Sequence, residues 1–116
     1  MAYPLLRLIV LRTHRLEESK AFYERLGIKF VEERHGKGPA HYAGAIGSAV
    51  LELYPLPKGA PDPDKSVRLG FSVSNLGTIA TQLGSASVRI GPSERNSPAI
   101  VVKDPDDRII ELTQEA

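Results

Sequence analysis

The chain has 116 residues, of which 41% are hydrophobic, and its 15 basic and 14 acidic side chains leave a net charge of +1. This is typical of one globular domain, and it argues against nucleic-acid binding, which usually needs a strongly basic face. The absence of cysteine excludes disulfides, thiolate nucleophiles and cysteine-ligated metal sites. We expect a cytoplasmic protein that does not contact a membrane, because the apolar run at 5–11 is far shorter than the roughly 20 residues of a membrane span.

The first half of the chain predicts the element order β-α-β-β-β. Apolar and β-branched residues mark the strands, and the spacing of Leu16, Phe22 and Leu26 indicates a helix with one apolar side. Gly27 suits the left-handed position just beyond the end of a helix. The predicted elements are a strand at 5–13, a helix at 16–26 and strands at 28–34, 42–46 and 49–54, with a turn at 36–39.

The second half predicts the same order in a more compact form. It follows a linker at 55–66, whose four prolines lack amide donors and stiffen the chain. A strand is expected at 67–73, a helix at 76–83 and strands at 87–90, 99–103 and 108–113, with residues 104–107 forming the last turn. We therefore predict a single domain over 1–116, made of module one (5–54), the linker (55–66) and module two (67–113).

An internal repeat supports two modules. Residues 11–16 align with 71–76 at an offset of 60, which places Leu11 on Phe71, and residues 50–53 align with 109–112 at an offset of 59. Each match joins an apolar, strand-like run to similar flanks. Two matches at nearly one offset indicate a duplicated structural unit and predict an α+β fold.

Glu52 and Glu111 occupy equivalent positions of this repeat, and each is the only charge within a short apolar strand. Because side chains alternate along a strand, Val50 shares a face with Glu52, and Ile109 shares a face with Glu111. The faces that carry the glutamates must meet water, a cation or a ligand. A solvated sheet face and a shared cavity are both compatible with this pattern.

Three segments in order resemble the glyoxalase, bleomycin-resistance and extradiol-dioxygenase superfamily, also called the vicinal oxygen chelate fold. They are residues 11–27, which end in Phe-Tyr-Glu-Arg-Leu-Gly, the strand Ala-Val-Leu-Glu-Leu at 49–53, and the closing run Val-Lys-Asp-Pro-Asp-Asp-Arg-Ile-Ile-Glu-Leu at 102–112. The resemblance covers nearly the whole chain. One departure is Asp107, where the family commonly has glycine, which alters the turn without threatening the fold.

This resemblance implies two β-α-β-β-β modules with curved mixed sheets that form a cup, completed in a homodimer. Metal-using members bring four ligands into the cup, one from the first strand and one glutamate from the last strand of each module. The glutamate positions match Glu52 and Glu111, whereas the other two fall on Leu8 and Arg68. Neither leucine nor protonated arginine offers a lone pair to a metal.

We therefore expect no metal and no cofactor. An arginine charge about 4 Å from a divalent ion would repel it by roughly 8 kcal/mol at an effective dielectric constant of about 20. Our hypothesis is that Arg68 takes over the neutralising role of the metal and faces Glu52, Glu111 or both. An ordinary surface position is the alternative for Arg68.

Arg12 is a candidate anion-binding residue, because alternation places it on the same strand face as Leu8. In glyoxalase I-like proteins an arginine at the matching Leu-Arg step helps to hold a carboxylate. The alternative is that Arg12 is a solvent-exposed arginine at the strand edge without a binding role. The three histidines, His14, His35 and His41, are predicted to be exposed near turns, with His41 able to approach the cup in a dimer.

The leading functional hypothesis is a protein with a degraded metal site that binds or sequesters a small organic molecule. Its ligand site is predicted to contain Arg12, Glu52, Arg68 and Glu111. The alternative is a lyase, isomerase or dioxygenase of the same superfamily that uses Glu52 or Glu111 as base or metal ligand. A carboxylate base would need a positive partner for the enediolate oxygen. A third reading, an assembly module without ligand, predicts a cup filled by its own side chains.

Overall fold

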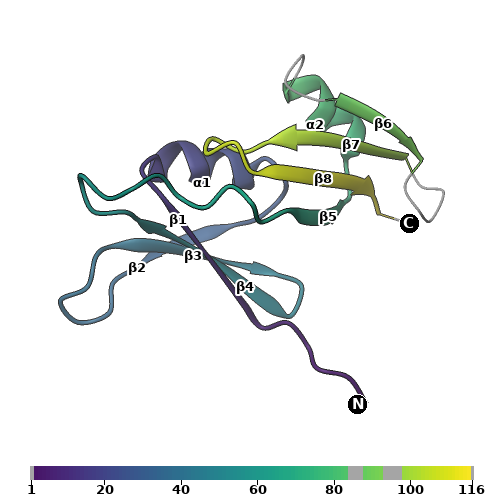
Figure 1. Cartoon of the computed structure of the whole chain (residues 1–116). Coiled ribbons are helices and arrows are strands. Elements are labelled where there is room, and N and C mark those ends of the chain that lie inside the picture. The colour runs from purple at the N-terminus through teal and green to yellow at the C-terminus, as the bar shows by residue number, and fades with distance from the viewer. Residues whose placement is uncertain (1, 84–87, 93–97, 116) are drawn as a thin grey trace. The chain divides into compact units, whose positions relative to one another are not determined.

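A computed structural model describes residues 2–83, 88–92 and 98–115, and it divides the chain into two compact units, Met1–Pro63 and Asp64–Ala116. Each unit contains one β-α-β-β-β module (Figure 1). Unit 1 consists of β1 (Leu8–Thr13), α1 (Leu16–Glu24), β2 (Phe30–Glu33), β3 (His41–Ile46) and β4 (Ala49–Pro55). Unit 2 consists of β5 (Leu69–Val73), α2 (Leu76–Leu83), β6 (Val88–Pro92), β7 (Pro98–Lys103) and β8 (Ile109–Gln114).

The predicted α+β fold of two such modules is confirmed, and the differences lie at element ends. The first strand was expected to begin at residue 5 but begins at Leu8, because Leu8 is the first residue that pairs with β4. Helix α1 ends at Glu24, and Gly27 follows with a φ angle of 107°, in the left-handed region expected for it. Ser87, where the sixth strand was expected to begin, lies outside the described residues.

Both units have a mixed four-stranded sheet of the same topology, in the order β1-β4-β3-β2 in unit 1 and β5-β8-β7-β6 in unit 2. The first strand pairs in parallel with the last one, and their register repeats: Leu11 lies opposite Leu53, as Phe71 lies opposite Leu112. The offsets found in the sequence are therefore offsets of equivalent strand positions. One consequence is that Glu52 and Glu111 occupy the same place in the two sheets.

The core of unit 1 lies between α1 and one face of its sheet. Phe22 and Tyr23 on the helix are buried, as are Leu11, Leu51 and Leu53 on β1 and β4. Helix α1 starts without a side-chain cap at Arg15. The amide of Arg15 instead donates to the Thr13 hydroxyl at 2.8 Å, which anchors the strand-to-helix turn. This packing uses one sheet face only and leaves the other face for the site described below.

In unit 2 the turn between β7 and β8 is held by a buried charge network. The guanidinium of Arg108 donates to Asp104 at 3.2 Å, to Asp106 at 3.3 Å and to the carbonyl oxygen of Asp64 at 3.1 Å. Asp107 has a φ angle of 66°. This conformation favours glycine, which explains the residue that the resemblance expects here. Asp107 stands in place of that glycine, and the turn keeps the left-handed backbone.

A hydrogen bond from Tyr42 on β3 to Glu17 links the sheet of unit 1 to α1. The tyrosine hydroxyl donates to Glu17 at 2.6 Å, and this hydrogen bond, helped by slight desolvation and by the charges of Glu17, Glu32 and Glu24, raises the pKa of Tyr42 to about 12. The pKa of Tyr42 in the folded chain lies above its ordinary value of 10.0. The hydrogen bond to Glu17 therefore stabilises the folded chain fully below about pH 10, and this contribution is lost as the pH rises through 12.

We expect an alkaline absorbance titration to contain a late tyrosinate component that Tyr42→Phe removes and Glu17→Gln shifts to lower pH. Glu18→Gln is the control, because the Glu18 carboxylate pairs with Arg15 instead. A late component that persists unchanged in Tyr42→Phe would contradict this assignment.

Among the described helices, none combines the length and the apolar character that crossing a membrane would require.

Candidate functional site

The sheet face of unit 1 that points away from α1 carries an apolar surface. Leu8, Val10, Val31 and Val50 are all exposed there, Leu8 to 53% and Val31 to 62%. The strand register brings them together, because Leu8 pairs with Val50, Val10 with Glu52, and Val31 with Ala43. A contiguous set of exposed aliphatic side chains on one sheet face is a feature of binding surfaces.

This surface is hollowed into an open groove of about 560 Å³. Leu8, Val31, Ala45 and Val50 form its apolar lining, and four polar side chains complete it: Arg7, Glu33, His35 and Glu52. The volume lies within the range of about 300 to 1,000 Å³ that is common for small-molecule sites. Apolar walls with a few converging polar groups are the usual composition of such sites.

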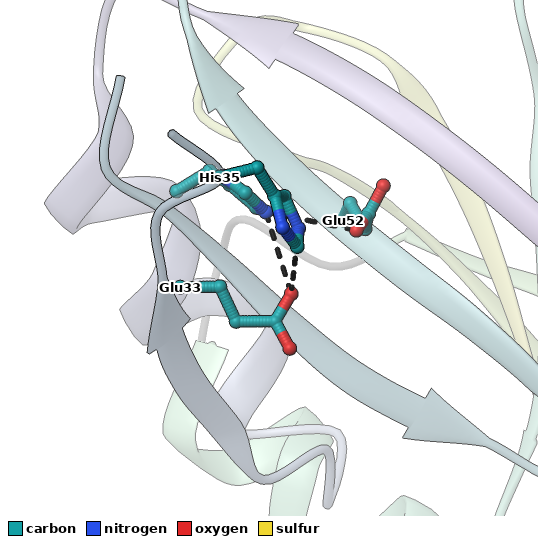
Figure 2. A group of neighbouring side chains, drawn as sticks. Glu33, His35 and Glu52 are labelled. Carbon is teal, nitrogen blue, oxygen red and sulfur yellow. Dashed lines mark ion pairs between the residues drawn. The ribbon is translucent and has the colours of Figure 1, made fainter. Parts of the chain in front are cut away.

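The polar end of the groove is a four-residue cluster that we call the unit 1 cluster: Glu33, His35, His41 and Glu52. One potential ligand atom from each residue lies within 4.8 Å of the others. The Nε2 atom of His41 is 3.4 Å from Glu33 Oε1 and 3.7 Å from Glu52 Oε2, and His35 Nε2 is 3.6 Å from the same Glu33 oxygen. Figure 2 shows the labelled side chains of Glu33, His35 and Glu52 turned toward one another.

Three strands and one loop position this cluster. In the β2–β3 hairpin Glu33 pairs with His41, and Glu52 on β4 lies opposite Ala43, the next residue on that face of β3. His35 follows β2 in the loop, and its side chain is exposed. Hairpin register thus places groups from separate parts of the sequence at one point.

His41 is the buried member of the cluster, with 1% of its surface exposed. Its Nδ1 atom lies 3.3 Å from the carbonyl oxygen of Pro39, and its ring stacks on Tyr54 with the centroids 4.0 Å apart. A carbonyl only accepts hydrogen bonds, so Nδ1 carries the proton in this contact, and in a neutral ring Nε2 then presents a lone pair. Among the described residues no hydrogen-bond partner reaches Nε2.

The electrostatics of the cluster demand a positive species. The Nε2 lone pair of a neutral His41 faces two carboxylate oxygens, and all three are acceptors. The carboxylate oxygens of Glu33 and Glu52 lie within 4.8 Å of each other, a distance at which two negative charges repel by at least about 3 kcal/mol at an effective dielectric constant of about 20. Either a proton on Nε2 or a metal ion among the four groups would relieve this repulsion.

The prediction that all three histidines are exposed is wrong for His41 and confirmed for His14 and His35. His41 is buried because it lies within β3, between the paired strands β2 and β4, rather than in the turn before it. The sequence analysis therefore missed Glu33, His35 and His41 as a group.

Two of the predicted site residues lie on the same face as the groove. Glu52 contributes directly and is largely buried, and Arg12 lies beside it on β1, opposite Tyr54. The Arg12 guanidinium carbon is 5.3 Å from the centroid of the Tyr54 ring, a cation–π contact. Arg12 therefore reaches the cluster through Tyr54, and its role in anion binding stays a prediction.

The other two predicted residues lie in unit 2. Glu111 is half-buried on β8 opposite Gly70, and Arg68 is exposed immediately before β5, on the same side of the sheet by alternation. Among the residues that the structure describes in unit 2, no ion pair joins Arg68 to Glu111. The proposed pairing of Arg68 with a glutamate stays a prediction.

Comparison with known proteins identifies the family. The sequence model of the Glyoxalase/Bleomycin resistance protein/Dioxygenase superfamily matches residues 6–112. The chain belongs to this superfamily. No curated protein matches it.

Solved structures of similar fold cover nearly the whole chain at low identity. TnmS3, an antibiotic binding protein from Streptomyces, is 22% identical with a TM-score of 0.71, over 100% of this chain and 99% of that one. A putative glyoxalase family protein from Bacillus anthracis is 15% identical with a TM-score of 0.73, over 100% and 98%. Lactoylglutathione lyase from Agrobacterium tumefaciens is 15% identical with a TM-score of 0.66, over 98% and 96%. These likenesses show the fold alone.

Proposed function

We propose that this superfamily member binds or sequesters a small organic molecule in the groove of unit 1, without a metal ion held jointly by the four ligand positions that the resemblance implies. The observation that carries the proposal is the groove itself, in which exposed aliphatic side chains lead to a polar end. An antibiotic binding protein is among the structures of similar fold, which supports binding as a use of this scaffold. Ligand-binding roles for Arg12, Glu52, Arg68 and Glu111, and a homodimer, belong to the same proposal.

The absence of a metal at those positions rests on Leu8 and Arg68. Leu8 lines the groove and is exposed there, so an aliphatic side chain occupies the position of a ligand on the first strand. Arg68 offers only donors. Two glutamates alone do not supply the three or four protein ligands of a usual zinc site.

A matched pair of leucine variants tests the groove. We expect Leu8→Gln to weaken binding about tenfold, because the apolar contact of a partly exposed leucine is worth about 1 to 2 kcal/mol. Leu6→Gln is the control, since Leu6 is also exposed but does not line the groove. The measurement is a ligand-observed NMR screen with uncharged, cationic and anionic aromatic fragments, followed by titration of the hits.

The proposal fails if no fragment binds, or if both leucine variants bind every fragment as the unaltered chain does. Turnover of a hemithioacetal that disappears in Glu111→Gln or Glu52→Gln would instead favour the lyase or isomerase reading. Light scattering coupled to size exclusion measures the homodimer separately.

A further inference from the structure

We propose that the unit 1 cluster is a divalent transition-metal site, with Zn²⁺ as the ion that its ligands fit. Three of its members, Glu33, His35 and His41, lie outside the four positions that the resemblance implies for a metal. The site goes beyond the proposed function, because it stands on the geometry of the cluster whether or not an organic molecule binds in the groove.

The geometry of the cluster is close to a coordination shell. Zinc bonds of about 2.0 to 2.1 Å to nitrogen and oxygen place the corners of a tetrahedron about 3.4 Å apart. The three separations given above are 3.4, 3.6 and 3.7 Å. Side-chain movements of a few tenths of an ångström would bring these three pairs to the tetrahedral spacing, and the other three pairs of ligand atoms lie within 4.8 Å of each other.

The orientation of His41 is the second, independent observation. It is buried, its Nδ1–H is directed to the Pro39 carbonyl, and its Nε2 points at Glu33 and Glu52 without a hydrogen-bond partner among the described groups. A ligating histidine typically donates its other ring N–H to a backbone carbonyl in this way, which fixes the tautomer and the ring plane. Stacking on Tyr54 further restrains that plane.

The chemistry of the donors selects the kind of metal. Two imidazole nitrogens disfavour Ca²⁺ and Mg²⁺, which prefer oxygen ligands, and suit Zn²⁺, Ni²⁺ and Cu²⁺. Two carboxylates cancel the double positive charge of the ion, so the filled site is neutral. Four protein ligands close a tetrahedral zinc site, and we infer that the ion clamps the loop carrying His35 onto β3 and β4.

The test is metal binding by the whole chain after treatment with a chelator. We expect isothermal titration with Zn²⁺ to give one ion per chain, and Co²⁺ to give the intense visible bands of a tetrahedral site. His35→Ala and Glu33→Gln should each weaken Zn²⁺ binding by at least about 100-fold, because even loss of an outer-sphere partner costs 10- to 100-fold. Both positions are on the surface of the hairpin, so the fold is expected to survive.

Two control variants match these changes. His14→Ala removes another exposed histidine of unit 1, and Glu32→Gln removes the neighbouring glutamate on the opposite face of β2. Neither should change the affinity for Zn²⁺. Nitrogen-15 NMR of the histidine rings should show the His41 Nε2 resonance move when Zn²⁺ is added.

The proposal is overturned if Zn²⁺ does not bind saturably, or if His14→Ala weakens binding as much as His35→Ala does. It is also overturned if His41 is an imidazolium whose resonances ignore added Zn²⁺, since a proton then fills the position. Leu8→Gln leaves the ligands intact and should retain Zn²⁺ binding, so failure of the groove and failure of the metal site are distinguishable.

Discussion

Replacing Asp104 by alanine is expected to lower the free energy of unfolding of unit 2 by about 3 kcal/mol. Asp104 and Arg108 are both buried, and their side chains form an ion pair at 3.2 Å. The same carboxylate also accepts the amides of Asp106 and Arg108 at 2.9 Å each. Loss of one partner of a buried pair usually costs about 3 to 5 kcal/mol, and the lower end applies because Asp106 still faces the guanidinium.

Urea unfolding followed by circular dichroism measures the change, and amide hydrogen exchange locates it in β7 and β8. The matched control is Asp107→Asn in the same turn. Asp107 is exposed and left-handed, and asparagine tolerates that backbone, so the control should stay within about 0.5 kcal/mol. Equal stability of Asp104→Ala and the unaltered chain would show that the turn holds itself through backbone hydrogen bonds alone.

The fold could be predicted from the sequence because the patterns that indicate it are either local or repeated along the chain. The glycine that follows the first helix, the proline-rich linker and the alternating strands are each set by short-range sterics. The offset between Leu11 and Phe71 added long-range information, because duplicated modules must place equivalent residues at equivalent strand positions. The strand register bears this out, with Val10 opposite Glu52 and Gly70 opposite Glu111.

The unit 1 cluster could be predicted only in part from the sequence. Glu52 was singled out by its charge within an apolar strand, but His41 was assigned to solvent because it follows a polar turn. A signal was present: Glu33 and His41 lie at equal distances from Lys37 in the turn, and an antiparallel hairpin centred there pairs them. What the sequence could not supply is the rotamer of His41, which depends on Tyr54 and Pro39.

The second large effect is expected from Gly44→Ala on β3, which connects the fold to the site. A Cβ atom at Gly44 would lie 2.5 Å from Ile28 Cγ2 and 2.9 Å from the carbonyl oxygen of Lys29. The side chain could rotate away, but the backbone oxygen cannot move without displacing the start of β2. We expect a loss of about 3 kcal/mol in the free energy of unfolding, at the upper end of the cost of overpacking.

The displacement would also reach the unit 1 cluster. Gly44 pairs with Phe30 in the same hairpin that sets Glu33 opposite His41, so a shift of β2 should lengthen the 3.4 Å contact between those side chains and weaken Zn²⁺ binding along with stability. Gly70→Ala on β5 is the control, because its Cβ would meet nothing closer than the Glu111 carbonyl oxygen at 3.9 Å. If both alanine variants unfold at the same urea concentration, the close approach at Gly44 does not constrain the hairpin, and the cluster must be positioned by other contacts.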